Sequence, residues 1–307
     1  MSILDQLAEH ARERVARAKR ERPDICREAL TLPKGDFPFE RALSGPALAF
    51  ICECKKASPS KGLIAPEFAY LDIAKDYEAA DADAISVLTE PKWFLGSDDY
   101  LREIAANVSL PCLRKDFTVD AYMLYEAKLL GASAALLICA ILDEKQLKDY
   151  IDICDGLGLS ALVEAHDAAE VEAALKAGAR VVGVNNRNLK DFTVDTGNSR
   201  RLRALIPKNV LFVSESGVKD AHDAQAARDI GADAVLVGEA LMRATDKAAK
   251  LAALRGTPRR RSSCAGCRGP ATSTRSTRSC RITSALCSRK RAGGMSRPKR
   301  RRHCVKR

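Results

Sequence analysis

Eight short apolar runs, separated by stretches of helical character, constrain the fold of this chain more than any other feature. The runs span residues 48–54, 84–88, 111–113, 134–140, 160–163, 181–184, 210–213 and 234–237. The stretches between them are rich in Ala, Leu, Glu and Lys, as in 121–130 and 168–177. Strands that are apolar on both faces and alternate with helices are typical of a parallel sheet. Three helical stretches end in Gly-Ala, and Gly131, Gly178 and Gly231 suit the left-handed residue that ends a helix.

Eight strand–helix units in about 200 residues predict a single closed (β/α)₈ barrel, the TIM barrel fold. The structural alternative is a doubly wound open sheet, but no GxGxxG motif follows the first apolar run. Before the barrel, residues 3–22 have the apolar spacing of an amphipathic helix that stops before Pro23. A second short helical stretch and a loop with Pro33, Gly35 and Pro38 follow. We therefore predict an N-terminal helical extension (1–47), a barrel (48–256) and a tail (257–307).

The charge of the chain is divided unevenly between the predicted barrel and the tail. The net charge is +11, yet residues 257–307 hold 17 Lys and Arg and no Asp or Glu. The first 256 residues therefore carry 34 basic and 40 acidic side chains. Such asymmetry between parts of a chain can indicate contact with nucleic acid or a membrane surface, here through the tail alone.

Cysteine usage and apolar run lengths indicate a cytoplasmic protein without membrane spans. Six of the eleven cysteines precede residue 257. They lie mostly in apolar strand patterns, as small buried side chains do in a reducing compartment. The first residues include Asp5 and Glu9, so no signal-peptide core is expected. The longest apolar run, 134–142, is too short to cross a bilayer. The oligomeric state is left open, and a monomer is compatible with the sequence.

Polar side chains recur where the predicted strands end, and this recurrence indicates an active site. They are Glu53 and Lys55, Lys115 and Phe117, Glu164, Asn185 and Arg187, Glu215 with Ser216-Gly217, and Gly238-Glu239. Any one of them is explained by a solvated loop or a structural ion pair. Together they are too many charges for packing, since a dense buried cluster is costly unless it binds something. The lysines and Arg187 suit an anionic substrate, Glu164 and Lys115 suit a base and an acid, and the two glycine turns suit phosphate.

Several blocks resemble indole-3-glycerol-phosphate synthase of tryptophan biosynthesis, from about residue 3 to about residue 256. They are ICECKKASPSKGLI (51–64), ISVLTEPKWFLGS (85–97), RKDFTVDAYMLYEAKLLGA (114–132), EAHDAAEVEAALKAGARVVGVNNRNL (164–189), VSESGV (213–218) and ADAVLVGEALMRA (232–244). The resemblance implies a carboxy-lyase that needs no metal or organic cofactor. Its substrate would be 1-(2-carboxyphenylamino)-1-deoxyribulose 5-phosphate, closed to indole-3-glycerol phosphate with loss of CO₂ and water.

The resemblance also implies a role for each matching residue. Lys115 would be the general acid and Glu164 the base or dehydration partner, with Glu53, Lys55 and Asn185 completing the catalytic set. Arg187 and Asn185 would hold the hydroxyl and carboxylate ends of the substrate. The substrate-binding set would further include Ser58, Glu215, Ser216, Gly217, Gly238 and Glu239, mostly around the phosphate, and Phe117 with Trp93 and Phe94 as walls for the ring. The N-terminal helix would cover the barrel mouth or pack outside the barrel.

Two alternatives remain at this stage. Another phosphate-binding barrel, phosphoribosylanthranilate isomerase, would pair a Cys with an Asp, but Cys52 and Cys54 have no well-placed Asp. The tail after Gly256 does not match the family, and its composition predicts disorder. In descending order, it is an out-of-frame or read-through product, a segment that binds nucleic acid or anionic surfaces, or a zinc site. The zinc site would use Cys264, Cys267, Cys280 and Cys287.

Overall fold

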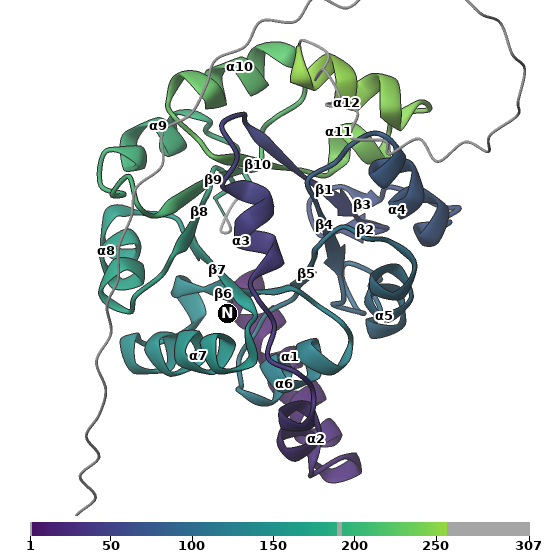
Figure 1. Cartoon of the computed structure of the whole chain (residues 1–307), viewed down its shortest axis with the longest axis vertical. Coiled ribbons are helices and arrows are strands. Elements are labelled where there is room, and N and C mark those ends of the chain that lie inside the picture. Colours follow the sequence, from purple (N-terminus) through teal and green to yellow (C-terminus); the bar gives the residue numbers. More distant parts are fainter. Residues whose placement is uncertain (1, 189–191, 257–307) are drawn as a thin grey trace, which may run out of the picture. The chain divides into compact units, whose positions relative to one another are not determined.

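Eight parallel strands form a closed barrel in the part of the chain that the computed structural model describes, residues 2–188 and 192–256. Around the ring the order is β1-β10-β9-β8-β7-β6-β5-β4, as seen in Figure 1. The strands are β1 (Ala49–Cys54), β4 (Ala84–Leu88), β5 (Cys112–Lys115), β6 (Ala134–Ile138), β7 (Ser160–Ala165), β8 (Val181–Asn185), β9 (Leu211–Glu215) and β10 (Ala234–Val237). Closure of β1 onto both β10 and β4 confirms the (β/α)₈ barrel and excludes the open sheet.

Helices surround the barrel and return the chain from each strand to the next (Figure 1). They are α4 (Tyr70–Ala79), α5 (Asp98–Asn107), α6 (Tyr122–Leu129), α7 (Glu144–Leu157), α8 (Ala168–Lys176), α9 (Gly197–Arg203), α10 (Ala221–Asp229), α11 (Glu239–Met242) and α12 (Lys247–Arg255), with a 3₁₀ turn η1 (Cys139–Ile141). The predicted helix ends at Gly131, Gly178 and Gly231 are confirmed, because all three residues have positive φ.

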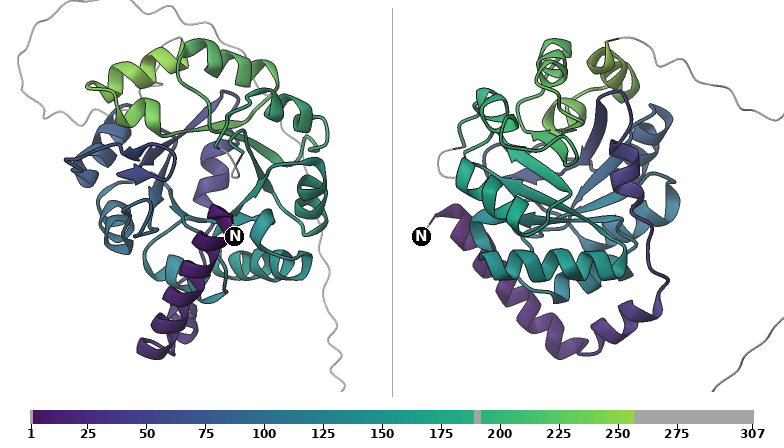
Figure 2. Two further views of the ribbon diagram at one scale, coloured as in Figure 1. Left: turned by 180° about the vertical axis from the view of Figure 1, so that it is seen from behind. Right: turned by 60° about the vertical axis from the view of Figure 1, so that its left-hand side comes forward.

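Three helices precede the barrel: α1 (Ile3–Glu21), α2 (Ile25–Thr31) and α3 (Pro38–Leu43). α3 lies in front of the barrel in Figure 1, and α1 lies in front after the half-turn in Figure 2, so they occupy opposite ends. Phe39 and Leu43 of α3 are fully buried in the apolar cluster inside the barrel. α3 therefore seals the end of the barrel opposite to α1.

Alternation of side chains along the strands divides the apolar core into two layers. Ile51, Leu162 and Val213 point into the barrel, while Phe50, Val163 and Phe212 point outward to the helices. All six side chains are completely buried. Side chains two residues apart share a face of a strand, so the inward row that carries this packing also carries the polar residues at the strand ends.

Several boundaries differ from the sequence predictions. The predicted strand 111–113 runs from Cys112 to Lys115, and the predicted strands 160–163 and 210–213 extend to Ala165 and Glu215. In each case the strand continues into charged residues, which an apolar pattern cannot detect. The loop predicted around Pro38 is instead the start of α3, since proline is tolerated in the first turn of a helix. A small antiparallel hairpin, β2 (Ala57–Ser58) with β3 (Gly62–Leu63), was not predicted.

Candidate active site

A cavity of about 640 Å³ opens at the C-terminal ends of the strands. Its lining includes all fourteen residues proposed from the sequence. These are Glu53, Lys55, Ser58, Phe94, Lys115, Phe117, Glu164, Asn185, Arg187, Glu215, Ser216, Gly217, Gly238 and Glu239. Residues up to 186 positions apart in the sequence thus meet in one space, and the inward positions of the strands bring them there.

Lys115, at the end of β5, lies between two carboxylates at the base of the cavity. Its Nζ is 3.0 Å from Glu164 Oε2 on β7 and 3.0 Å from Glu215 Oε2 on β9. Both carboxylates are almost completely buried. Gly183 on β8 leaves the space that Glu215 Oε1 fills, because a Cβ at that position would overlap the carboxylate.

The surroundings of this cluster shift its three pKa values in different ways. Burial would lower the pKa of Lys115, but Glu164, Glu215 and Glu53 raise it above its usual value. The sequence left this balance open, and the structure decides it in favour of a protonated lysine. Burial would raise the pKa of Glu164, but Lys115, His166 and Asn185 lower it. Glu215 is not compensated in this way, so burial raises its pKa. Glu164 is therefore the ionised carboxylate, and Glu215 holds a proton more readily.

A chain of hydrogen bonds continues from Glu164 toward the predicted phosphate region. Asn185 Nδ2 donates to Glu164 Oε1 at 3.1 Å, and Ser216 Oγ donates to Asn185 Oδ1 at 2.9 Å. The Arg187 main-chain N–H also donates to Asn185 Oδ1, at 3.0 Å. Asn185 is thus fixed from three sides, and it can position a substrate hydroxyl beside the base.

Lys55 and Glu53, two residues apart at the end of β1, form a direct ion pair in the cavity. Gly238 faces them across the barrel, and a Cβ there would overlap the Glu53 carboxylate and approach Lys55 Nζ. The absence of a side chain at Gly238 therefore leaves room for this pair.

The turns after β9 and β10 have the backbone geometry of an anion site. Ser216 and Gly217 have successive positive φ angles of 65° and 98°, a conformation that turns consecutive N–H groups to one side. Gly217 is required here, because a Cβ would lie 2.6 Å from Thr196 Cγ2. Cationic side chains surround these turns in the cavity lining, namely Lys61, Lys219, Arg243 and Lys250. The sequence reasoning missed these four, although Lys61 lies inside the quoted 51–64 block.

An apolar slot forms the other side of the cavity. The rings of Phe94 and Phe117 lie 6.0 Å apart, and Leu136 and Ile138 of β6 lie in the same lining. Ile3, Leu4 and Leu7 of α1 complete the lining. α1 thus covers the barrel mouth, one of its two predicted placements. Trp93, expected beside Phe94, is absent from this lining, and its ring meets the edge of His10 instead.

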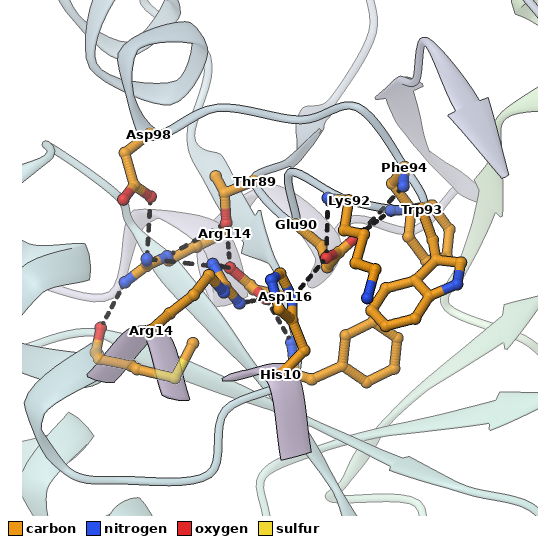
Figure 3. Close-up of polar contacts among 12 residues, drawn as sticks. His10, Arg14, Thr89, Glu90, Lys92, Trp93, Phe94, Asp98, Arg114 and Asp116 are labelled. Atoms are coloured by element: carbon orange, nitrogen blue, oxygen red, sulfur yellow. Dashed lines mark hydrogen bonds and ion pairs between the residues drawn. The ribbon is translucent and has the colours of Figure 1, made fainter. Parts of the chain in front are cut away.

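A buried polar network ties α1 to the two loops that carry the phenylalanines (Figure 3). Glu90 is completely buried, and its carboxylate accepts from the main-chain N–H groups of Lys92, Trp93 and Phe94. His10 Nδ1 of α1 lies 3.2 Å from the same carboxylate.

Asp116 plays the corresponding part in the loop after β5. It accepts two hydrogen bonds from Arg14 of α1, at 2.7 and 3.1 Å, and one from Thr89 Oγ1 at 2.7 Å. It also accepts from the Phe117 main-chain N–H at 2.8 Å. Sequence reasoning did not single out these residues, because they point away from the cavity and act on the backbone of the loops.

Comparison with known proteins identifies the family. The model of the indole-3-glycerol phosphate synthase family matches residues 4–254. The chain belongs to this family. A relative of that name from Ruminiclostridium cellulolyticum is 59% identical over 257 residues, which cover 83% of this chain and 99% of the relative. Another, from Leuconostoc mesenteroides, is 52% identical over 260 residues, with 83% and 99% covered.

Solved structures support the fold assignment alone. A 3-hexulose-6-phosphate synthase matches with a TM-score of 0.54 at 16% identity, covering 68% of this chain and 99% of the other. An N-acetylmannosamine-6-phosphate 2-epimerase from Clostridium perfringens matches with a TM-score of 0.52 at 17% identity, with 64% and 88% covered.

The remaining sequence predictions concern the cysteines, membrane spans and the tail. Cys52, Cys54, Cys112 and Cys154 are buried, as predicted. No helix in the described residues combines the length and the apolar character that a bilayer span requires. The predicted disorder of the tail, its basic surface and the zinc site at Cys264, Cys267, Cys280 and Cys287 lie outside the described residues.

Proposed function

We propose that the chain catalyses the decarboxylating ring closure of 1-(2-carboxyphenylamino)-1-deoxyribulose 5-phosphate to indole-3-glycerol phosphate, in tryptophan biosynthesis. The observation that carries this proposal is Lys115, whose Nζ lies 3.0 Å from Glu164 and from Glu215 at the base of the cavity. A protonated amine and an ionised carboxylate within one hydrogen bond of each other can act on a single substrate as acid and base.

The two sides of the cavity suit the two ends of this substrate. The phosphate would bind at Ser216-Gly217 and Gly238-Glu239, with Ser58 beside them, and the aromatic ring would lie between Phe94 and Phe117. Anchoring both ends bends the chain between them, so that the ring carbon meets the carbonyl carbon. Such positioning replaces much of the entropy that an unbound chain would lose on cyclisation.

Acid–base chemistry at the centre then follows the charges of the site. The ring carbon that bears the carboxylate forms a bond to the carbonyl carbon, and Lys115 protonates the carbonyl oxygen. CO₂ leaves, and the electron pair of the broken bond returns to the ring. Glu164 then takes a proton from the substrate while the hydroxyl leaves as water, protonated by Lys55 or Lys115. Arg187 would hold the substrate carboxylate, and Asn185 a hydroxyl.

The cysteines argue against phosphoribosylanthranilate isomerase activity. Cys52 and Cys54 lie in the apolar layer between the barrel and its helices, and burial raises the pKa of both thiols. Within the described part of the cavity lining no cysteine occurs. A cysteine base is therefore not available there. The six cysteines of the described residues are free thiols, which supports a reducing location such as the cytoplasm.

The deciding experiment measures indole-3-glycerol phosphate formation by fluorescence with the purified full-length chain. Wild type is expected to form product, and Lys115→Ala and Glu164→Gln are expected to lower kcat by about 10²–10⁴-fold, the usual contribution of an acid or base. Lys148→Ala, which removes an exposed lysine paired with Asp152, serves as the control and should leave kcat unchanged. A folded wild-type protein without product would contradict the proposal.

A further inference from the structure

His166 lies directly behind the proposed base, and the mechanism above gives it no role. It follows β7 by one residue, and its Nε2 is 3.5 Å from Glu164 Oε1. This nitrogen is buried and has no hydrogen-bond partner in the described structure. A buried polar atom without a partner is costly, so its direction toward Glu164 calls for an explanation.

Glu170, in the first turn of α8, holds the imidazole ring from the other side. Glu170 Oε2 lies 3.2 Å from His166 Nδ1 and also accepts from the His166 main-chain N–H at 2.7 Å. A carboxylate at Nδ1 favours the proton on that nitrogen and stabilises the imidazolium form. Nε2 then faces Glu164 as the second N–H of a cation.

We propose that His166 is a positioning residue for the reaction, held by Glu170 so that its positive charge keeps the Glu164 carboxylate ionised and directed into the cavity. This inference rests on the proposed function of Glu164. It explains why one of two buried carboxylates beside Lys115 serves as the base. Glu164 Oε1 meets Asn185 and His166, whereas Glu215 Oε1 has no hydrogen-bond partner in the described residues.

The charged groups around the pair favour this arrangement. Glu164 faces Lys115 on β5, Glu215 on β9 and His166 itself. His166 faces Glu164, Glu170 and Glu215, and a second cavity beside it is lined by further charges at Asp167, Arg187, Asp195 and Arg201. Burial would lower the pKa of His166, but the hydrogen bond to Glu170 and the three glutamates raise it.

The first test is the pH profile of kcat/KM for His166→Gln, which keeps an amide donor and loses the charge. The acid limb of the profile is expected to move up by about one pH unit, since an opposite charge at this range lowers a carboxyl pKa by about that much. KM and the rate at the alkaline plateau should stay near the wild-type values. An unchanged limb, or an equal loss of rate at every pH, would overturn the proposal.

Two variants on α8 provide a comparison that does not require replacing His166. Glu170→Gln keeps an acceptor for the main-chain N–H but removes the counter-charge, so the limb should move in the same direction by less. Glu172→Gln, on the same helix and exposed beside Lys176, should change nothing. If His166→Gln does not fold, an unshifted limb in Glu170→Gln overturns the proposal by itself. Loss of the proposed function would instead appear as an inactive wild type.

A second readout needs no activity. Histidine-selective NMR titration follows the four histidines of the chain, and the signal missing from His166→Gln assigns His166. In Glu164→Gln the pKa of His166 should fall by about the amount that His166 lowers the pKa of Glu164, because coupling between two sites is reciprocal. An unchanged His166 titration would contradict the pairing.

Discussion

At the scale of single residues, the site separates two chemically identical carboxylates. Glu164 and Glu215 both contact Lys115 and both are buried, so the lysine alone cannot distinguish them. The difference comes from the outer oxygen, which has Asn185 and His166 beside it in Glu164 and the surface of Gly183 in Glu215. A base and a proton-holding acid group can therefore coexist a few ångströms apart.

This difference predicts how stability depends on pH. Burial raises the pKa of Glu215 from 4.5 to about 7, so the unfolded chain ionises there first. The wild type should lose stability as pH rises between these values, because its folded state binds the extra proton. Glu215→Gln removes that loss. Its free energy of unfolding relative to wild type should rise by about 2 kcal/mol between pH 5 and pH 8.

Urea unfolding at pH 5 and pH 8 measures this change, with the exposed Glu67→Gln as the control. The control should show the same difference from wild type at both pH values. A Glu215→Gln protein that is destabilised more at pH 8 than at pH 5 would show that the Lys115 contact outweighs burial.

At the scale of elements, the alternating pattern was sufficient for the barrel and for most of the site. Inward positions alternate along each strand, so Glu53, Lys115, Glu164, Asn185 and Glu215 could be placed at one mouth from the sequence. The pattern was not sufficient where charge or proline interrupts an element, as at the ends of β5 and β7 and at α3. It also did not reveal the network below the aromatic slot, since Glu90 and Asp116 act on main-chain N–H groups that no sequence motif displays.

That network predicts a specific role for α1. Arg14→Ala removes the bidentate partner of Asp116, which is almost completely buried. Breaking one side of a buried pair costs about 3 kcal/mol, and the loop that carries Phe117 should loosen. We expect a lower free energy of unfolding together with a higher KM, because the ring slot is less well formed.

The matched control lies on the same helix. Arg12 pairs with Glu9 on the exposed side of α1, and Arg12→Ala should cost less than about 1 kcal/mol and leave KM unchanged. Equal effects of the two substitutions on stability would indicate a general loss of helix charge and would contradict the bracing role.

At the scale of the whole molecule, the chain consists of a family-like part and a segment of different character. The family model ends at residue 254, and α12 ends at Arg255. All fourteen proposed site residues precede that point. The 17 basic residues after Gly256 reverse the charge of the chain without adding an acid. Catalysis and any contact with polyanions should therefore be separable by a single truncation.

A chain that ends at Gly256 tests this separation. Its kcat and KM should equal those of the full-length protein within about twofold, because no residue of the proposed acid–base set, ring slot or phosphate turns is removed. Retention on a heparin column and binding to a mixed-sequence DNA duplex should be confined to the full-length chain and should weaken steeply with salt, as binding through phosphate contacts does. If neither chain binds polyanions, the tail reading without a selected function is favoured. If truncation abolishes product formation in a folded protein, residues after 256 take part in the site, and the assignment of catalysis to the barrel alone is wrong.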